Sequence, residues 1–207
     1  MSISTYEIRK CQSCGLRYPL TEGHSFGVRC PHCLGETLVI LNKKMGAGER
    51  ADEENRMNGK ARAVLLDNIR SAWNVGSILR SADGFGFDHV YLCGITPTPE
   101  LEAVRKTALG ADEHVSWSSH KDAVELIKEL KLKDWKVVAL EEDERSVPIS
   151  SFQPTDSTVL ILGSEVTGVD PELLDLADAI VFIPMRGQKR SFNVAVAFGV
   201  AGFSLSS

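Results

Sequence analysis

The chain has 207 residues, of which 43% are hydrophobic and 25% charged, and its formal net charge is -5. This length allows one full-sized domain and a small accessory unit, and the composition excludes a disordered or fibrous protein. The acidic balance also excludes a protein covered in basic surface, so any contact with nucleic acid must depend on local patches.

The first ten residues and the longest uncharged run indicate where the protein is expected to act. Residues 1–10 lack the basic and then apolar pattern of a secretory signal. We therefore expect a cytoplasmic protein whose thiols stay reduced. The longest uncharged run, residues 191–207, is shorter than the roughly 20 apolar residues that span a bilayer. It predicts a buried C-terminal helix and no membrane partner.

Residues 1–41 form the first predicted unit, which ends in the strand-like run 37–41. Two CxxC pairs lie in it, Cys11 with Cys14 and Cys30 with Cys33. Four thiolates at this spacing suit a tetrahedral Zn²⁺ and fill its coordination shell, so we expect structural zinc. Free or redox-active cysteines are the alternative, but forty residues bury too little apolar area to fold without a metal or a disulfide. The unit resembles a zinc ribbon.

Basic side chains lie close to these cysteines in the sequence. They are Arg9, Lys10, Arg17 and Arg29. They could contact phosphates or could form ordinary solvated surface, and the sequence does not choose between the two. The neighbouring Gly15 and Gly35 are expected to supply the backbone freedom that a metal knuckle needs.

A polar segment, residues 42–61, separates this unit from the rest and predicts a flexible linker or a frayed helix. In residues 62–207, apolar runs of strand length recur at 63–66, 89–93, 136–140, 158–162 and 179–183. The clearest helix between them is Lys121–Leu130, whose apolar residues recur at the spacing of one helical face. Alternating strands and helices predict an α/β fold, a mainly parallel sheet with helices on both faces and ligands at the carboxyl ends of its strands.

The first of three notable motifs in this domain is NVGSILRSADGFG, residues 74–86. It predicts a helix with Asn74 as its N-cap and with Gly84 and Gly86 at its end. Ordinary capping accounts for most of the motif. It does not account for the polar residues Asp67, Asn68, Arg70 and Asn74, which crowd the end of the preceding strand.

The second motif, LILGSEVTGVDP, covers residues 160–171 and predicts a strand, a loop bounded by Gly163 and Gly168, and a helix that begins near Pro171. The third, IPMRGQKRSFNVAVA, covers residues 183–197 and predicts a strand end, a basic loop and a helix of small residues. Ser191 and Asn193 are its possible caps. Three such loops at strand ends fit a nucleoside-sized pocket better than three unrelated turns.

Taken in this order, the three motifs resemble the signature motifs of the SpoU/TrmH family of RNA ribose methyltransferases, and the likeness spans residues 62–207. The resemblance implies a SPOUT-like fold with a C-terminal trefoil knot, a homodimer, S-adenosylmethionine as cofactor, and transfer RNA or ribosomal RNA methylated at a ribose 2'-hydroxyl. By the same resemblance, the cofactor-binding residues are Leu140, Gly163, Ile183, Met185 and Ser191. The catalytic-site residues are Asn74, Arg80, Glu165, Ser191 and Asn193. The chain departs from the family at Val166, where Gly is frequent, and at Phe192, where Leu is usual.

The arginine that corresponds to Arg80 is the family's proposed base, but a guanidinium with a pKa above about 12 accepts protons poorly. We expect Arg80 to anchor a phosphate and to stabilise the developing alkoxide. Glu165 is expected to orient Arg80 or a backbone amide, and Asn74 and Asn193 to fix the loops. A zinc-ribbon RNA-binding protein with an inactive methyltransferase domain is the main alternative. A dehydrogenase or an NTPase is disfavoured, because GxGxxG and GxxxxGK[ST] are both absent.

Overall fold

The structure is a computed structural model that describes residues 5–21, 28–44 and 60–206. The chain divides into two compact units, Met1–Asn55 and Arg56–Ser207. Most of the predicted linker, residues 45–59, lies outside the described residues. Residues 42–44 of that segment continue a strand. No helix among the described residues is long and apolar enough to cross a membrane.

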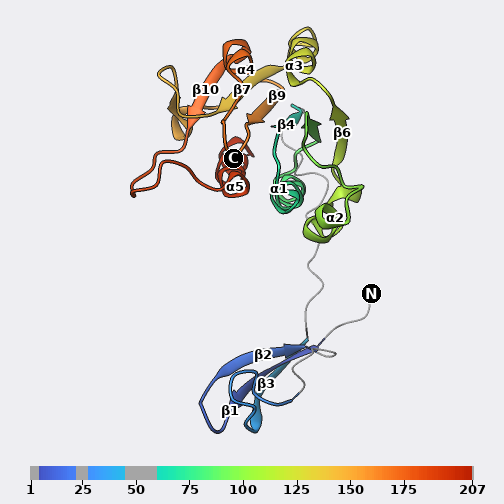
Figure 1. Cartoon of the computed structure of the whole chain (residues 1–207), viewed down its shortest axis with the longest axis vertical. Helices are drawn as coiled ribbons and strands as arrows, with labels where there is room; N and C mark the ends of the chain where they lie inside the picture. Colours follow the sequence, from blue (N-terminus) through green and yellow to red (C-terminus); the bar gives the residue numbers. More distant parts are fainter. Residues whose placement is uncertain (1–4, 22–27, 45–59, 207) are drawn as a thin grey trace. The chain divides into compact units, whose positions relative to one another are not determined.

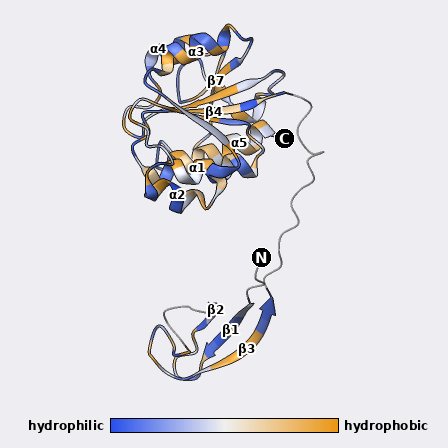
Figure 2. Cartoon of the chain, turned by 90° about the vertical axis from the view of Figure 1, so that its right-hand side faces the viewer, coloured by the Kyte–Doolittle hydropathy of each residue, from blue (hydrophilic) through white to orange (hydrophobic). Residues whose placement is uncertain are grey.

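The N-terminal unit is a small antiparallel sheet (Figure 1), in which β1 (Thr5–Cys11) lies between β2 (Arg17–Thr21) and β3 (Thr37–Lys44), as Figure 2 shows. The predicted strand 37–41 is confirmed and extends to Lys44. The sequence did not predict β2, because its five residues, RYPLT, alternate weakly and include a proline. The two CxxC pairs follow β1 and precede β3.

The larger unit is built on a seven-stranded sheet in the order β6-β5-β4-β9-β7-β10-β8, and every described pairing is parallel. Its strands are β4 (Arg62–Asp67), β5 (His89–Cys93), β6 (Ser116–His120), β7 (Lys136–Leu140), β8 (Val147–Pro148), β9 (Thr158–Leu162) and β10 (Ala179–Phe182). The five predicted strands are confirmed. The two that were missed lie at the edges of the sheet, where pairing with one neighbour does not require a hydrophobic run.

Helices cover both faces of the sheet, as predicted (Figure 2). On one face lie α1 (Ala72–Gly84), α2 (Glu102–Ala108) and α5 (Val194–Ser206), and on the other lie α3 (Ala123–Lys131) and α4 (Pro171–Leu176). Alternate residues of each central strand serve the two cores: Val64 and Leu66 face α1, whereas Ala63 and Leu65 face α3. Central strands buried on both sides are therefore continuous hydrophobic runs.

Helix α1 begins earlier than predicted. Ser71 is its N-cap, and the Ser71 hydroxyl accepts the N–H of Asn74. Asn74 is therefore not the cap but a residue of the first turn, which leaves its side chain free for other contacts. The helix ends at Gly84, and Gly86 takes a positive φ of 72°. Gly76 lets α2 approach, because a Cβ there would lie 2.6 Å from the Thr107 Cβ.

The predicted helix at 121–130 is confirmed as α3, with Asp122 as N-cap and the predicted apolar face buried. The start of α4 at Pro171 is also confirmed, and Asp170 caps it. The C-terminal helix differs from its prediction, because α5 is buried on one side only. Val196, Val200 and Phe203 are 51%, 40% and 65% exposed.

Arg62 fixes the far end of α5 to the sheet. Its guanidinium is almost fully buried and donates hydrogen bonds to the carbonyls of Leu205, Asp156 and Ala61. A cation at a helix C-terminus is favourable because it meets the negative end of the helix dipole. Arg62 therefore holds the C-terminal end of α5 against the sheet. The N-terminal end of the same helix borders the site described next.

Candidate functional site

The four cysteines of the N-terminal unit lie together, with all Sγ atoms within 4.8 Å of one another. The Sγ atoms of Cys11 and Cys33 are 3.5 Å apart, and those of Cys14 and Cys30 are 3.7 Å apart. Tetrahedral zinc with Zn–S bonds of about 2.3 Å requires sulfur separations of about 3.8 Å. The donor set therefore fits one zinc ion with four thiolates.

Backbone N–H groups point at the Cys11 Sγ. The Cys11 Sγ accepts the N–H groups of Ser13 and Cys14, both at 3.4 Å, and the bond from Cys14 contributes most to lowering the pKa of the Cys11 thiol to about 6. Gly15 takes the positive φ that was predicted, but in the second knuckle Leu34 does so in place of Gly35. Gly35 is needed for space, since a Cβ there would lie 2.6 Å from the Ser13 Oγ.

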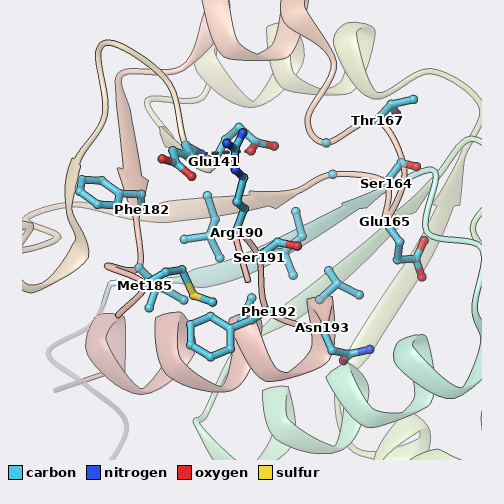
Figure 3. A pocket seen from close by; sticks show the side chains of 18 of the residues that line it. Glu141, Ser164, Glu165, Thr167, Phe182, Met185, Arg190, Ser191, Phe192 and Asn193 are labelled. Atoms are coloured by element: carbon cyan, nitrogen blue, oxygen red, sulfur yellow. Dashed lines mark hydrogen bonds between the residues drawn. The ribbon is translucent and has the colours of Figure 1, made fainter. Parts of the chain in front are cut away.

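In the larger unit, a cavity of about 820 Å³ opens at the carboxyl ends of β7, β9 and β10 (Figure 3). Four segments line it, residues 140–142, 162–168, 182–185 and 190–194, together with Ala197. The second and third motifs supply most of these residues, and each segment follows the strand that was predicted before it. The volume lies within the usual range for small-molecule sites.

All five predicted cofactor-binding residues line this cavity: Leu140, Gly163, Ile183, Met185 and Ser191. Of the predicted catalytic residues, Glu165, Ser191 and Asn193 line it as well. Asn74 reaches the same edge through hydrogen bonds, and Arg80 does not line the cavity. The structure brings these positions together, while the roles of the individual residues stay predictions.

A chain of polar contacts joins the three motifs at the rim of the cavity. The Asn193 amide donates to the Asn74 Oδ1 at 3.1 Å, and the Asn74 amide donates to the Glu165 Oε1 at 2.8 Å. The Asn193 Oδ1 also accepts the N–H of Ala195 and so caps α5. Each asparagine amide is thereby held in one orientation, because its oxygen and its nitrogen have different partners.

Glu165 closes this chain at the start of α1. Its carboxylate accepts the backbone N–H groups of Arg70, at 3.1 Å, and Ser71, at 3.4 Å. Partial burial raises the pKa of Glu165, but the hydrogen bonds from Arg70, Asn74 and Ser71 lower it by more, so its pKa lies below the usual value. The carboxylate therefore stays ionised near neutral pH. Of the two contacts expected for Glu165, with Arg80 or with a backbone amide, it makes the second.

Arg80 lies on the outward side of α1, six residues beyond Asn74, or about 9 Å further along the helix axis. Its side chain is exposed. It is not among the described residues that line the cavity. Glu165 does not orient it within one chain, because the carboxylate accepts from Asn74 and from backbone instead.

Glu141 is a cavity residue that the sequence did not single out. It follows β7 directly and carries a carboxylate into the cavity wall (Figure 3). Its Oε1 accepts the N–H of Glu142 and its Oε2 accepts that of Val169, both at 3.0 Å. A carboxylate oxygen accepts more than one hydrogen bond, so each retains accepting capacity. The sequence offers one indication of this site residue, since Glu141 directly follows the predicted strand 136–140.

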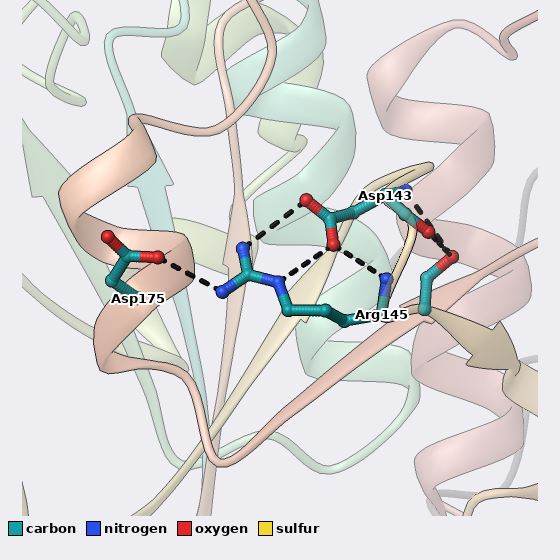
Figure 4. A network of polar contacts seen from close by, with 4 residues as sticks. Asp143, Arg145 and Asp175 are labelled. Carbon is teal, nitrogen blue, oxygen red and sulfur yellow. Dashed lines mark hydrogen bonds and ion pairs between the residues drawn. The ribbon is translucent and has the colours of Figure 1, made fainter.

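A network of charges stabilises the segment that carries Glu141 (Figure 4). Arg145 donates through Nε and Nη2 to the two carboxylate oxygens of Asp143, and through Nη1 to Asp175 of α4. These bonds lower the pKa of Asp143 and raise that of Arg145. The pairs are largely exposed, so we expect a modest energy, but their two-pronged geometry fixes the loop after β7 against α4.

Two glycines allow the loop after β9 to fold back on itself. The N–H of Gly168 donates to the carbonyl of Ser164 at 2.9 Å, and Gly168 has a φ of 73°. A Cβ on Gly163 would overlap backbone atoms of Gly168 and Val169. Both glycines are required by space or by φ, as the second motif suggested, and the resulting turn presents Glu165 to α1.

The sequence was compared with family models, and residues 61–203 match the model of the SpoU rRNA Methylase family. The match covers the larger unit and leaves the cysteine-containing unit outside. It includes all three motifs and the whole cavity.

Among curated relatives, a tRNA (guanosine(18)-2'-O)-methyltransferase of Thermus thermophilus is 33% identical over 156 residues, 74% of this chain and 78% of that protein. The enzyme of the same name from Aquifex aeolicus is 29% identical over 78% of this chain and 75% of its own length. A 23S rRNA (guanosine-2'-O-)-methyltransferase of Acinetobacter baylyi is 30% identical over 78% of this chain and 64% of its own length.

Solved structures show the same fold. An AdoMet-bound rRNA methyltransferase of Sinorhizobium meliloti superposes with a TM-score of 0.66 and 30% identity, over 72% of this chain and 56% of that one. The TrmH/SpoU tRNA modifying enzyme of A. aeolicus gives a TM-score of 0.66 and 27% identity, over 73% and 77%. The three curated relatives are named for methylation of a guanosine 2'-hydroxyl, in tRNA or in 23S rRNA. The two solved structures share the fold.

Proposed function

The chain belongs to the SpoU rRNA methylase family, and on this premise we propose that it transfers a methyl group from S-adenosylmethionine to a ribose 2'-hydroxyl of tRNA or rRNA. The observation that carries the proposal is the polar chain Asn193–Asn74–Glu165, which joins the three motifs at the rim of one nucleoside-sized cavity. The alternative, an inactive domain attached to an RNA-binding zinc ribbon, differs from this proposal in the outcome of the turnover assay given below. The trefoil knot that the resemblance implies stays a prediction.

The cavity fits an adenosine-containing cofactor in size and in donor set. Gly163 and Ile183 offer backbone groups and close approach, and Leu140 and Met185 offer apolar surface. Glu141 offers a carboxylate that backbone N–H groups hold in place. We propose that it accepts hydrogen bonds from the ribose hydroxyls of the cofactor, since an acidic residue after a strand end has this role in other nucleotide-binding sheets.

The bound cofactor supplies a methyl group on a sulfonium, which is electrophilic without further activation. The protein's contribution is then to hold the acceptor ribose in line and to assist loss of its proton. Asn74 and Asn193 are positioned to fix the rim on which the nucleotide would rest. Glu165 holds the start of α1, and we propose that it acts through this placement rather than as a base.

Arg80 needs a second copy of the chain to meet a cavity. Helices α1 and α5 run side by side in the same direction, because Asn74 contacts Asn193 at one end and Phe85 contacts Phe203 at the other. Trp73 and Arg80 are seven residues apart and so share one face of α1. Both are exposed, Trp73 by 66%.

The outward face of α5 adds Val196, Val200 and Phe203 to this surface. Exposed apolar residues at such spacing are typical of an interface. We propose that two copies pack through α1 and α5 as a homodimer, so that Arg80 of one copy serves the cavity of the other. There it would anchor a phosphate and stabilise the developing alkoxide, with water or a phosphate oxygen taking the proton.

The cysteine cluster is proposed to hold one structural Zn²⁺, since its four sulfurs leave no coordination position for a substrate. Four reduced cysteines require a compartment that keeps thiols reduced, and we propose the cytoplasm.

Transfer of labelled methyl groups from S-adenosylmethionine to total RNA tests the proposal. We expect label in alkali-resistant ribose-methylated dinucleotides, because a 2'-O-methyl group blocks cleavage at that position. Arg80→Ala should abolish transfer and leave cofactor affinity, measured by calorimetry, nearly intact. Label on bases, or equal loss of transfer and cofactor binding in Arg80→Ala, would contradict the assignment.

Mixing two inactive variants tests whether Arg80 acts across the dimer. Arg80→Ala retains the cavity and Gly163→Ala retains the arginine, so a mixed dimer contains one complete site only if the arginine serves the partner's cavity. Restored transfer on mixing is the expected result. Sedimentation should also show a dimer that Val200→Asp converts to a monomer.

A further inference from the structure

Residues 1–44 of the N-terminal unit carry an excess of positive charge, with six Lys and Arg residues against Glu7, Glu22 and Glu36. The chain as a whole has a net charge of -5. The basic residues are Arg9, Lys10, Arg17, Arg29, Lys43 and Lys44. Residues 45–207 contain more acidic than basic residues, so the small sheet is the part better suited to attract a polyanion.

Strand register sorts these side chains onto two faces of the small sheet, because directly paired residues share a face. Lys10 of β1 pairs with Arg17 of β2 and Leu38 of β3, and Tyr6 pairs with Lys43. Ile8 lies between them along β1, paired with Pro19 and Leu41. We call this set the open face; its members are Tyr6, Ile8, Lys10, Arg17, Pro19, Thr21, Leu38, Leu41 and Lys43.

On the other face Arg9 is neutralised and part of the sheet is covered, whereas Val39 and Lys44 are exposed. Arg9 pairs with Glu7 and donates to the Thr37 hydroxyl. The segment that carries the second knuckle packs there, since the Tyr18 hydroxyl donates to the carbonyl of Arg29 and the Thr37 hydroxyl to that of Val28. Arg9 is thus excluded as a free cation, which the sequence alone could not decide.

The open face remains accessible. Lys10, Arg17 and Lys43 are exposed, and Leu38 and Leu41 are 55% and 44% exposed. Among its described members there is no acidic residue. Both hydrophobic and hydrophilic residues lie on β3, as Figure 2 shows by colour. Val39 and Ile40, which are not members of the open face, are each 46% exposed as well, so its combination of apolar side chains with three cations is what distinguishes the open face.

The composition of the open face matches unpaired RNA. Three cations suit phosphates, and an aromatic ring flanked by aliphatic side chains suits the faces of unstacked bases, the combination by which single strands are bound. Along β1, Lys10 and the Tyr6–Lys43 pair are four residues apart, or about 13 Å. A backbone could therefore run along β1 with cations at both ends and apolar surface between them.

We propose that the open face of the N-terminal sheet binds an unpaired segment of the RNA substrate through Lys10, Arg17 and Lys43, with Tyr6 stacking on a base. This inference rests on the proposed function for the nature of the partner. It assigns to the zinc-binding unit a contact with RNA in addition to those expected of Arg80 and of the basic loop in the third motif.

Adjacent lysines on opposite faces of β3 provide a matched test. Lys43 belongs to the open face, whereas Lys44 pairs with Thr5 on the other. Full-length Lys10→Glu/Lys43→Glu, Lys43→Glu and Lys44→Glu proteins are titrated into fluorescein-labelled dodecauridylate and read by fluorescence anisotropy. We expect a loss of about tenfold or more for the double variant and a clear loss for Lys43→Glu. Lys44→Glu, with the same change of charge, should stay within about twofold.

The salt dependence provides a second readout. Each phosphate contact to a single strand contributes about 0.7 to the slope of log affinity against log salt. The triple variant Lys10→Ala/Arg17→Ala/Lys43→Ala should therefore lower that slope by about 2. Tyr6→Ala should weaken binding at high salt as strongly as at low salt, because stacking is not screened. Zinc content equal to that of the unaltered protein verifies that each variant is folded.

Three outcomes would overturn the inference. The first two are equal losses of RNA affinity for Lys43→Glu and Lys44→Glu, and no loss of RNA affinity for the double variant. The third is tighter binding of polyglutamate than of dodecauridylate, which would indicate that the partner of the open face is an acidic protein. Methyl transfer is measured separately with saturating RNA. Failure of all transfer with the anisotropy pattern intact would refute the proposed reaction and leave the RNA-binding face standing.

Discussion

Asp67 provides the sharpest link between this fold and a measurable quantity. The side chain lies at the end of β4, is 5% exposed, and receives one hydrogen bond from the Asn68 amide at 2.8 Å. Burial, with a further contribution from the charge of Asp170, raises its pKa from 3.8 to about 6. A shift of about two pKa units corresponds to about 3 kcal/mol at 1.36 kcal/mol per unit.

The sign of the effect follows from proton linkage. Below a pH of about 4, Asp67 is protonated in both the folded and the unfolded state, so its burial costs nothing extra. Between about pH 4 and 6 the unfolded state loses the proton and the folded state keeps it, so stability falls as pH rises. Above pH 6 the cost is complete and constant. Asp67→Asn removes it and keeps a carbonyl oxygen for Asn68.

We therefore expect Asp67→Asn to gain about 2–3 kcal/mol in unfolding free energy over the unaltered protein on going from pH 4 to pH 7.5. Urea unfolding followed by tryptophan fluorescence measures this in the larger unit alone, since Trp73, Trp117 and Trp135 all lie there. An equal difference between the two proteins at both pH values would refute the reasoning.

Three further predictions concern the site and the metal. Glu165→Ala should cost about 1 kcal/mol of stability, because it removes a carboxylate from the start of α1, and should reduce methyl transfer much more than cofactor binding; calorimetry and turnover that fall together would contradict this. Gly163→Ala should abolish cofactor binding, since its Cβ would overlap the backbone of Gly168, whereas Gly187→Ala, where a Cβ meets nothing within 4 Å, should bind normally in the same titration. Cys14→Ser should eliminate bound zinc, measured by elemental analysis, without altering the tryptophan-monitored unfolding of the larger unit; a shifted transition would show that the two units depend on each other.

The strands that the sequence predicted are those buried on both sides. The runs at 136–140 and 158–162 are continuous apolar segments and match β7 and β9 in both bounds. The edge strand β6 has the sequence SWSSH. It pairs with β5 through its backbone, but its side chains are mostly polar and none is fully buried, so no hydrophobic pattern predicts it. Helix α2 is only seven residues long, too short for periodicity to indicate it.

The family resemblance predicted part of the candidate site, and no sequence pattern predicted its contacts. The resemblance named Glu165, Ser191 and Asn193, and all three line the cavity, whereas Arg80 does not. The sequence interpreted Asn74 as a cap, because asparagine is a favoured N-cap. The structure assigns the cap to Ser71 and gives the Asn74 side chain to Glu165 and Asn193. Glu141 was overlooked because one carboxylate beside a strand is not distinctive.

The sequence by itself determined the two-unit composition, the pairs of cysteines, the parallel sheet and the loops that line the cavity, because these depend on hydrophobic periodicity, on cysteine spacing and on glycine positions that are local in the chain. Only the tertiary structure decided which polar groups meet, since Asn74 and Asn193 are 119 residues apart and contact each other only when α1 and α5 pack side by side. It likewise decided that Arg9 is neutralised while Lys10 and Lys43 stay exposed, because the face that a strand residue occupies depends on its register with its neighbours.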